Sequence, residues 1–539
     1  MVKTEKTGTQ PMKRCFLLSI ALSAFIALSA EVHITIDDPA TWSGQALYPY
    51  VGQTVVFDVP MVVCTNANGK YTVSPWRRFQ PENQGVLGTA EYNETVRINS
   101  SCMFSISDIT QYHRCGEKIY NLRATVNSTS SLTFKDGKWK GNKRADLEKG
   151  LPDLGNYSLL VCGFNLENYF TTIGSMGAQS EYDRQKQRTK ISKALKKINA
   201  DIFGLVELQQ GDEAIGEIVS DLNKNLPGRN YRFFSQPSAG TMQKTDFVYD
   251  ANKVDPIGKA VETGVETKDR KKMLCFREKS SGEKFIFGIN HFKAMSGDES
   301  IRVNEAKAVV DLYNSYRQNR NIRDDDVLIM GDLNCYAMTT PIQVFKDRGL
   351  IDLHRAFHAD SSYSYMFSNL ASYIDHAICN STLFRQVTGM AAYHINSDED
   401  DRYTYDKSDD NTMFRCSDHD PVLVGLRLDS AMSGEPYFNG SDFGMDSLTF
   451  YYAYVPGEEN KNPLVYFDIY TISGYKVCAP TELKFNKFNP EAHLKYYTFN
   501  RENPDLPDEI KDFLPLPAGM YVIRFYYNGT VKSLKLIVQ

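Results

Sequence analysis

The sequence predicts a multidomain protein of the α/β (α+β) class, and three observations lead to this prediction. The chain of 539 residues is too long for one ordinary hydrophobic core. Its central part combines apolar runs of strand length with an amphipathic helix at residues 184–200. The regions before and after it contain short strand patterns separated by turn residues. We therefore expect an α/β centre between two β-rich flanks.

Residues 1–30 have the pattern of a secretory signal peptide. Lys13 and Arg14 precede an apolar run from Phe16 to Ala30 that ends in small residues. The alternative is an uncleaved membrane anchor, but this run is short for a bilayer span and no later run approaches that length. We expect a secreted or cell-surface protein without a stable membrane span.

Net charge and cysteine spacing exclude two simple interpretations. The formal net charge of −5 gives no general attraction to a polyanion, so binding of nucleic acid requires a local basic patch. One of the ten cysteines lies in the leader, and the irregular spacing of the others is not a disulfide framework. Cys64, Cys102 and Cys115 lie in one region and could supply one pair.

Residues 31–150 are predicted to form a small all-β domain with an OB-like barrel, followed by a charged connector. A cluster in this domain could stack on and bind single-stranded nucleic acid, although such residues more commonly occupy core and rim positions. The cluster consists of Tyr71, Trp76, Arg77, Arg78 and Phe79. The helix at residues 184–200 likewise has a basic face that could meet a polyanion, although such faces are more often simply solvated.

Six apolar strand patterns in the central part each deliver polar or ionisable groups at one end. In chain order, these ends read Asn165-Leu-Glu-Asn168, Asp201-Ile-Phe-Gly-Leu-Val-Glu207, Asn290-His-Phe-Lys293, Gly331-Asp-Leu-Asn334, Tyr373-Ile-Asp-His376 and Ser417-Asp-His-Asp-Pro421. Any one of them alone would more often be a turn or a surface charge. Together they predict a single site.

The residue types at these ends are those of a metal-assisted phosphodiesterase. A carboxylate such as Glu207 can hold a hard divalent cation through oxygen. A carboxylate and a His–Asp pair can position and deprotonate water, while Asn and Lys donors stabilise charge on phosphoryl oxygens. The chain has neither a Gly-rich phosphate loop nor a Gly-x-Ser-x-Gly elbow, which excludes NTPase and serine-hydrolase interpretations.

In this order, the six motifs resemble those of the endonuclease/exonuclease/phosphatase superfamily, the DNase I-like enzymes, over residues 154–428. Residues 387–396, followed by Asp398-Glu399-Asp400, further resemble the secreted bacterial nuclease branch. The resemblance implies a four-layer α/β/β/α sandwich, with two sheets face to face and the site at one edge.

The resemblance also implies roles for the metal-facing residues. Glu207 would be the principal metal ligand, with Asn165 and Asp418 nearby on the metal or the phosphate. Asp332 would orient or deprotonate the water, and Asn334 would contact the phosphate.

The remaining site residues would act on protons and substrate. His419 would be the general base or a transition-state stabiliser, held by Asp375, and His291 would protonate the leaving oxygen. Lys293 and Asn290 would bind substrate.

Three local features of the site are not determined by the sequence. No acidic partner for His291 is visible in the sequence. Residues 240–248 depart from the Gly-Thr-Asp-x-Ile strand of the family. Strict alternation would place Asp418 and His419 on opposite faces, so we predict a turn before the last strand.

Residues 436–539 are predicted to form a β-sandwich, because residues 465–477 and 516–539 alternate in hydropathy around Gly turns. They resemble type IX secretion sorting domains, which implies contact with secretion machinery, although residues 478–515 would be an unusually long insertion. The alternative is an accessory binding module.

The favoured hypothesis is a secreted nuclease that cleaves DNA and possibly RNA with Mg²⁺, or alternatively Mn²⁺ or Ca²⁺. A lipid or inositol phosphate phosphoesterase on the same fold is the enzymatic rival. A non-catalytic binding protein would require gaps among the six motifs, and none is missing.

Overall fold

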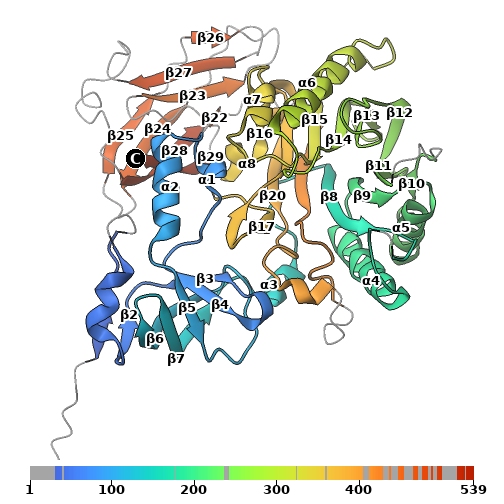
Figure 1. Ribbon diagram of the computed structural model, residues 1–539. Helices are drawn as coiled ribbons and strands as arrows, with labels where there is room; N and C mark the ends of the chain where they lie inside the picture. Colours follow the sequence, from blue (N-terminus) through green and yellow to red (C-terminus); the bar gives the residue numbers. More distant parts are fainter. Residues whose placement is uncertain are drawn as a thin grey trace, which may run out of the picture.

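The computed structural model describes most of the chain after the expected leader. The described residues are 31–38, 42–174, 176–235, 242–322, 324–358, 361–404, 412–428, 436–438, 447–453, 465–471, 476–482, 487–489, 494–500, 519–527 and 530–538. The leader at residues 1–30 lies outside them, as do Gly240 and Thr241. Mixed α/β structure forms the middle of the chain, and β-rich parts precede and follow it in the sequence (Figure 1).

The N-terminal part is a seven-stranded sheet that closes on itself. Its strand order is β1-β2-β6-β3-β4-β5-β7, and because β6 also pairs with β7, the strands from β6 to β7 form a ring. Along β6, buried and exposed positions alternate, so that one face of the strand fills the ring. The elements are β1 (Val32–Ile34), η1 (Gly44–Tyr50), β2 (Thr54–Phe57), β3 (Met61–Thr65), η2 (Ala67–Gly69), β4 (Tyr71–Ser74), α1 (Pro81–Gln84), α2 (Ala90–Ser100), β5 (Phe104–Ser107), β6 (Lys118–Ser128), β7 (Ser131–Lys140) and α3 (Arg144–Lys149).

The aromatic and basic cluster of this part is structural, so its interpretation as a nucleic-acid surface is wrong. Tyr71 and Trp76 pack in the ring core. Arg77 pairs with Asp398 of the central part, and Arg78 is buried and donates to the backbone carbonyl of Ile98. Both guanidinium groups are therefore occupied within the chain.

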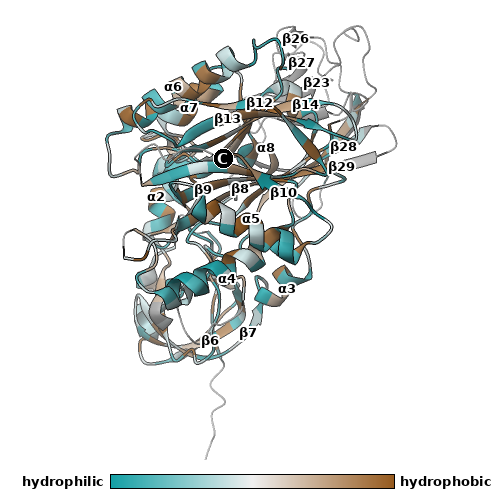
Figure 2. Ribbon diagram, turned by 90° about the vertical axis from the view of Figure 1, so that its right-hand side faces the viewer, coloured by the Kyte–Doolittle hydropathy of each residue, from teal (hydrophilic) through white to brown (hydrophobic). Residues whose placement is uncertain are grey.

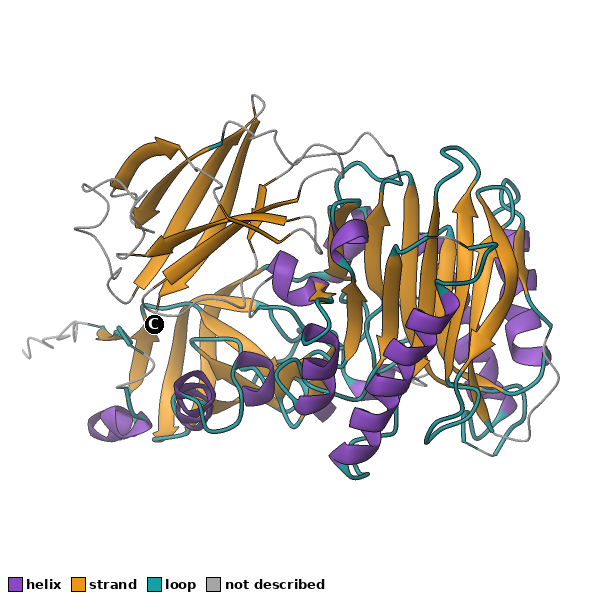
Figure 3. Ribbon diagram, turned by 90° about the horizontal axis from the view of Figure 1, so that it is seen from above, coloured by secondary structure: helices purple, strands orange, loops and turns teal. Residues whose placement is uncertain are grey.

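Two six-stranded sheets pack face to face in the centre, with helices on their outer sides (Figure 2). The strand orders are β10-β11-β9-β8-β21-β20 and β12-β13-β14-β15-β19-β16. Helices α4 and α5 cover the first sheet, and α6 and α7 cover the second. The strands of both β-rich flanks lie to one side of these layers in Figure 3.

The first sheet is mostly built from the two ends of the central part. Its strands are β8 (Leu159–Tyr169), β9 (Ile202–Gln209), β10 (Tyr231–Phe233), β11 (Gln243–Asp250), β20 (Val387–Ala392) and β21 (Val422–Leu426). The second sheet consists of β12 (Val254–Glu262), β13 (Lys271–Glu278), β14 (Lys284–His291), β15 (Val327–Asp332), β16 (Ile351–Asp352) and β19 (Asp375–Cys379). A separate hairpin consists of β17 (Tyr365–Phe367) and β18 (Leu370–Ser372).

The helices of the central part follow the strand ends. They are α4 (Glu181–Ile198), α5 (Glu213–Asn225), α6 (Glu299–Tyr316), α7 (Thr340–Lys346), α8 (Leu353–His358), α9 (Ser381–Phe384) and η3 (Asp401–Thr404). Helix α4 begins three residues before the predicted start because Ser180 caps it by accepting a hydrogen bond from the Asp183 amide.

The basic face of α4 packs within the fold, so both a polyanion surface and a simply solvated face are wrong for its central residues. Arg188 pairs with Glu217 and Asp221 of α5. Lys190 is 1% exposed, and its Nζ donates to the Phe414 carbonyl.

The C-terminal part consists of two antiparallel four-stranded sheets with the orders β22-β23-β27-β26 and β25-β24-β28-β29. The long insertion expected at residues 478–515 contributes β26 and β27 to the first of these sheets. The strands are β22 (Pro436–Phe438), β23 (Ser447–Ala453), β24 (Tyr466–Thr471), β25 (Lys476–Glu482), β26 (Lys487–Asn489), β27 (Leu494–Asn500), β28 (Gly519–Tyr527) and β29 (Thr530–Val538).

Two further expectations concern export. Within the described ranges, no helix has both the length and the apolar character needed to cross a membrane. Cys64, Cys102 and Cys115 are each free and buried, so the pair considered from the sequence does not form.

Candidate active site

The functional groups lie at one end of the space between the two central sheets. Apolar side chains fill that space, including Leu159, Val161, Ile202, Phe287, Ile289, Leu328 and Met330. Because side chains alternate along strands, the inward positions further along β8, β14 and β15 include Asn165, His291 and Asp332. The site is therefore the polar end of the core between the sheets.

Three acidic and imidazole groups stand in register on neighbouring strands of the second sheet. The parallel pairing of β14 with β15 sets His291 opposite Asp332. The antiparallel pairing of β15 with β19 sets Asp332 opposite Asp375. Directly opposed residues share one face of a sheet, so all three side chains point toward the first sheet.

Glu207 reaches the same space through an irregularity in β9. Val206 belongs to the core between the sheets, and Leu208 belongs to the core under α4 and α5, so regular alternation breaks between them. The break coincides with a φ of +61° at Glu207 and with a register shift between Asn165 and Tyr169 of β8. Such bulges re-aim side chains, and a left-handed non-glycine residue costs on the order of 1–3 kcal/mol.

Gly331 allows β15 to reach the site. Its φ is +122°, and a Cβ added there would lie 2.0 Å from the Asn290 carbonyl oxygen. Any other residue would push β15 away from β14 immediately before Asp332.

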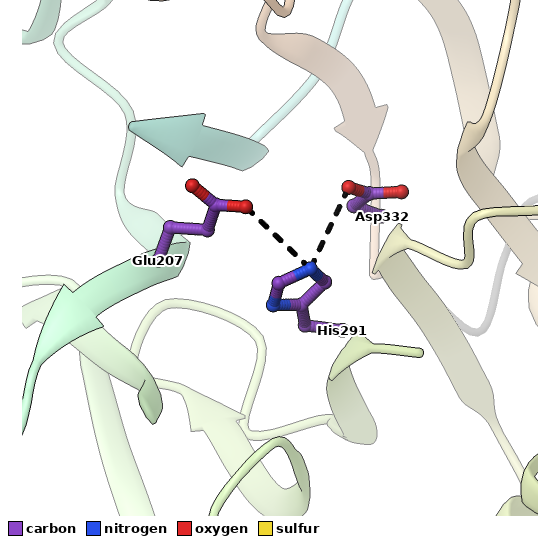
Figure 4. Close-up of side chains that lie close together, drawn as sticks. All are labelled: Glu207, His291 and Asp332. Atoms are coloured by element: carbon purple, nitrogen blue, oxygen red, sulfur yellow. Dashed lines mark ion pairs between the residues drawn. The ribbon is translucent and has the colours of Figure 1, made fainter. Parts of the chain in front are cut away.

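Glu207, His291 and Asp332 form a candidate metal site (Figure 4). The Nε2 atom of His291 lies 3.6 Å from Oε1 of Glu207 and 3.8 Å from Oδ2 of Asp332. One ligand atom from each residue lies within 4.8 Å of the other two. Asn165 lies beside them, because its Nδ2 donates to Oδ2 of Asp332 at 3.1 Å.

The electrostatics of the group fit a divalent cation. Burial raises the pKa of Asp332 to about 7, although His419 opposes the shift. Burial and the nearby Asp418 raise the pKa of Glu207, and the same two causes raise that of Glu167 to about 7. One carboxylate oxygen of Glu167, Oε2, is also buried without a hydrogen-bond partner. Crowded carboxylates with an unpaired oxygen are the donor set that a hard cation would stabilise.

His419 and Asp375 form a hydrogen-bonded pair beside this group. Nδ1 of His419 lies 2.8 Å from Oδ2 of Asp375, and Ser364 Oγ donates to the same oxygen at 2.7 Å. Nε2 of His419 is left 3.9 Å from Asp332 Oδ2. Burial lowers the pKa of His419, but Asp375 and Asp418 outweigh it and hold this pKa well above its ordinary value.

The predicted turn before the last strand is confirmed. Residues 413–419 form turns and bends, and β21 begins only at Val422. Asp418 is consequently half-buried on the same side as His419, with Oδ1 3.9 Å from Nε2 of the imidazole.

His291 differs from His419 in its environment. Its Nδ1 is buried without a hydrogen-bond partner, and Glu207 and Asp332 are both on the Nε2 side. Burial and the nearby Arg270 lower the pKa of His291 well below its ordinary value. A neutral imidazole suits a metal ligand, and the role of His291 as an acid stays a prediction.

The three predicted substrate contacts occupy different places. Asn290 has no exposed surface and donates to the Met330 carbonyl, which places it behind the site, on the side of α6. Asn334 lies at the site, but its Nδ2 donates to the Phe292 carbonyl at 3.1 Å. Lys293 is exposed on the loop after His291.

Sequence reasoning missed several residues around the site. Glu167 lies within a quoted motif, so its carboxylate could have been included. Arg270 precedes β13; burial lowers its pKa, and the nearby Glu207 and Glu305 offset only part of this shift. Tyr365 stacks on His419 with ring centroids 4.6 Å apart, which no local pattern signals.

Residues 164–419 match the Endonuclease/Exonuclease/phosphatase family. The chain contains a catalytic domain of this family. Together with the Glu207, His291 and Asp332 group, the match identifies a phosphoesterase with a candidate metal site. Comparison with curated proteins gave no match.

Three solved structures are similar to the family domain. A mannosyl-6-phosphatase from Bacteroides thetaiotaomicron VPI-5482 is 20% identical, with a TM-score of 0.37, and the match covers 50% of this chain and 99% of that one. The human Nocturnin catalytic domain with bound sulfate is 14% identical, with a TM-score of 0.35 and coverages of 49% and 93%. Truncated Caenorhabditis elegans TDP2 is 14% identical, with a TM-score of 0.37 and coverages of 51% and 100%.

Proposed function

We propose that this protein is a secreted, metal-dependent nuclease that hydrolyses phosphodiester bonds of DNA and RNA with an activated water. The observation that carries the proposal is the convergence of the Glu207, His291 and Asp332 group with the His419–Asp375 pair inside the family domain. The Glu207, His291 and Asp332 group offers oxygen and nitrogen ligands for a metal ion and a carboxylate that can accept a proton from water. The His419–Asp375 pair offers a fixed proton donor.

Mg²⁺ is the proposed cofactor, with Mn²⁺ and Ca²⁺ as alternatives. Glu207 and Asp332 would hold the cation, with His291 and Asp418 beside it. When bound, the ion would neutralise charge on the phosphoryl oxygens and acidify a water molecule.

The remaining steps, acceptance of a proton from water and stabilisation of the transition state, are assigned to separate side chains. Asp332 would accept a proton from the attacking water while the Asn165 amide donates to its Oδ2. His419 is charged, so its Nε2 donates to a phosphoryl oxygen as a transition-state stabiliser, and Asp375 fixes the ring. Arg270 supplies a second positive charge near Glu207.

The strand arrangement of the N-terminal part, rather than its Tyr71–Phe79 cluster, supports nucleic acid over a lipid or inositol phosphate as the substrate. Its closed ring of strands is the arrangement of an OB-like barrel. Barrels of that kind commonly bind oligonucleotides.

The decisive experiment offers the purified full-length protein plasmid DNA, RNA, an inositol phosphate and a phospholipid, each with Mg²⁺, Mn²⁺, Ca²⁺ or chelator. We expect nucleic-acid cleavage that chelator abolishes and that His419→Ala reduces by roughly 10²–10³-fold. Glu262→Gln, on exposed β12, is the matched control. Chelator-insensitive cleavage would exclude the mechanism, and hydrolysis of the inositol phosphate or lipid alone would favour the rival.

We also propose that the leader directs export and that the C-terminal β-sandwich, residues 436–539, engages secretion machinery. Expression of the full chain and of a chain ending at residue 428 in a bacterium with a type IX secretion system tests this. Only the full chain should reach the medium or cell surface, and equal export of both would contradict the sorting role.

A further inference from the structure

The contact between the N-terminal barrel and the catalytic region is built from buried ion pairs. Nη2 of Arg77 lies 2.5 Å from Oδ1 of Asp398, whose side chain is 0% exposed. Arg114 and Arg144 contact the equally buried Glu399, each at 2.5 Å. Because an unpaired buried charge is strongly destabilising, these arginines fix the acidic residues in place.

Asp398 is also held from the catalytic side. The Tyr363 hydroxyl donates to Oδ2 of Asp398 at 2.8 Å. The Arg77 guanidinium lies 4.6 Å from the centroid of the Tyr363 ring, so the arginine contacts both groups. Tyr363 thus connects the barrel to the segment that follows Tyr363 in the chain.

The next two residues of that segment hold the catalytic pair. Ser364 Oγ donates to Asp375 at 2.7 Å, and Tyr365 stacks on the His419 ring. The Ser364 carbonyl also accepts from the Asp420 amide at 2.8 Å. Three consecutive side chains therefore lead from the barrel to His419.

A second contact holds the far end of the same hairpin. Phe79 of the barrel forms a parallel bridge with Ala371 of β18. The Ala371 amide donates to the Arg78 carbonyl at 2.8 Å, and the Gln80 amide donates to the Ala371 carbonyl at 3.0 Å. The barrel thus contacts both the start and the end of the hairpin that carries Tyr365.

We propose that Arg77 is a positioning residue for phosphoester hydrolysis. Through Asp398 and Tyr363, the N-terminal barrel holds Ser364 and Tyr365 where they fix the Asp375–His419 pair. The inference rests on the proposed role of His419, but it does not require nucleic acid to be the substrate. Because Arg77 acts through other residues, its loss lowers kcat and leaves KM nearly unchanged.

The kinetic test compares Arg77→Met and Arg77→Lys in the full-length protein, on whichever phosphoester the wild type hydrolyses. A displacement of about 1 Å at a catalytic group can cost on the order of 10²-fold, so we expect kcat of Arg77→Met to fall at least about tenfold. Arg77→Lys should recover part of this loss, and KM should stay within about twofold. The control is Arg123→Met, in the same barrel, which loses only an exposed pair with Glu31. Unchanged kcat in Arg77→Met would overturn the proposal.

Hydrogen–deuterium exchange separates positioning from folding and from substrate choice. Peptides covering residues 363–366 and 417–420 should exchange faster in Arg77→Met than in the wild type or Arg123→Met. If Arg77→Met does not fold, Tyr363→Phe removes only the hydroxyl bond to Asp398 and should lower kcat in the same direction. Unchanged exchange at residues 417–420 would overturn the inference even if the enzyme cleaved no nucleic acid.

Discussion

Buried carboxylates occur in two regions of the catalytic part, and their surroundings differ. At the site, Glu207 and Asp332 lie among other carboxylates, and burial raises the pKa of both. At the contact with the barrel, burial would raise the pKa of Asp398, but Arg77 and Arg114 outweigh it and lower this pKa. An acid balanced by fixed arginines holds the fold together, whereas an acid left among like charges is available to a ligand. The contrast therefore distinguishes acids that can bind a ligand from acids that are already paired within the chain.

The largest expected effect is on catalysis, when a carboxylate of the candidate metal site is removed. Glu207→Gln removes one negative oxygen ligand without changing the shape of the side chain, and we expect kcat/KM to fall on the order of 10³-fold. Steady-state kinetics with saturating Mg²⁺ would measure this, with Glu262→Gln as the control. Activity within tenfold of the wild type would place the metal elsewhere.

For the Arg77–Asp398 pair at the barrel contact, the largest expected effect is on stability. Asp398→Asn leaves Arg77 buried without its counter-charge, and breaking such a pair costs about 3–5 kcal/mol. Urea unfolding followed by tryptophan fluorescence reports on the barrel, because Trp42, Trp76 and Trp139 all lie there.

A matched control tests whether burial is the cause of that loss. Glu31→Gln breaks the exposed pair with Arg123 and should change the free energy of unfolding by no more than about 0.5 kcal/mol. Equal losses in Asp398→Asn and Glu31→Gln would contradict the distinction between buried and exposed pairs.

Metal affinity should depend on pH because Asp332 must lose its proton before it binds a cation. With a pKa of about 7, its ionised fraction falls below that pH. The affinity for Mg²⁺ or Mn²⁺ should therefore decrease about tenfold per pH unit between pH 6.5 and 5. Isothermal titration calorimetry in two buffers would also detect the released proton, and a pH-independent affinity would refute the raised pKa.

The smallest effect is a pH-dependent change in Tm with opposite signs in the two regions. The folded-state pKa of Asp332 is about 7, above its ordinary value of 3.8, so its contribution to stability is complete below pH 3.8 and is lost as pH rises to 7. Asp332→Asn should therefore raise the Tm of the metal-free protein more at pH 8 than at pH 5, by about 2–4 °C per kcal/mol.

Asp398 should show the reverse dependence. Its pKa is lowered, so its contribution is complete above its ordinary value and is lost as pH falls through the folded-state value. The Tm loss of Asp398→Asn should be larger at pH 7 than at pH 3, and scanning calorimetry at both pH values would measure it. Changes of the same sign in Asp398→Asn and Asp332→Asn would break the comparison.

Several site residues could be found in the sequence because their signals are local. The apolar run that ends at Gly331 and the alternation along β15 point to Asp332 without knowledge of the fold. The need for a turn before Val422 followed from the same alternation. Asn290 shows the limit of this reasoning, since it shares a motif with His291 but faces the opposite side of β14.

Charges that meet across long distances in the chain could not be assigned in this way. Asp398 and Glu399 resembled a feature of secreted nucleases, and Arg77 resembled part of a nucleic-acid surface. Arg77 and Asp398 are separated by 321 positions, and only their contact shows that each neutralises the other. Glu167 and Arg270 were missed because only the charges that surround them in the folded chain, and not the residues next to them in sequence, place them at the site.

The sequence by itself determined which strands end in reactive groups, because periodicity and glycine breaks are properties of a few consecutive residues. The tertiary structure decided which acidic residues are balanced and which are not, because that depends on distances between charges on separate elements. It also decided the orientation of Glu207, because the φ of +61° at this residue interrupts the alternation of side chains along β9. The charge balance of buried groups depends on packing, and in this protein it distinguishes the acids of the candidate site from those at the contact with the barrel.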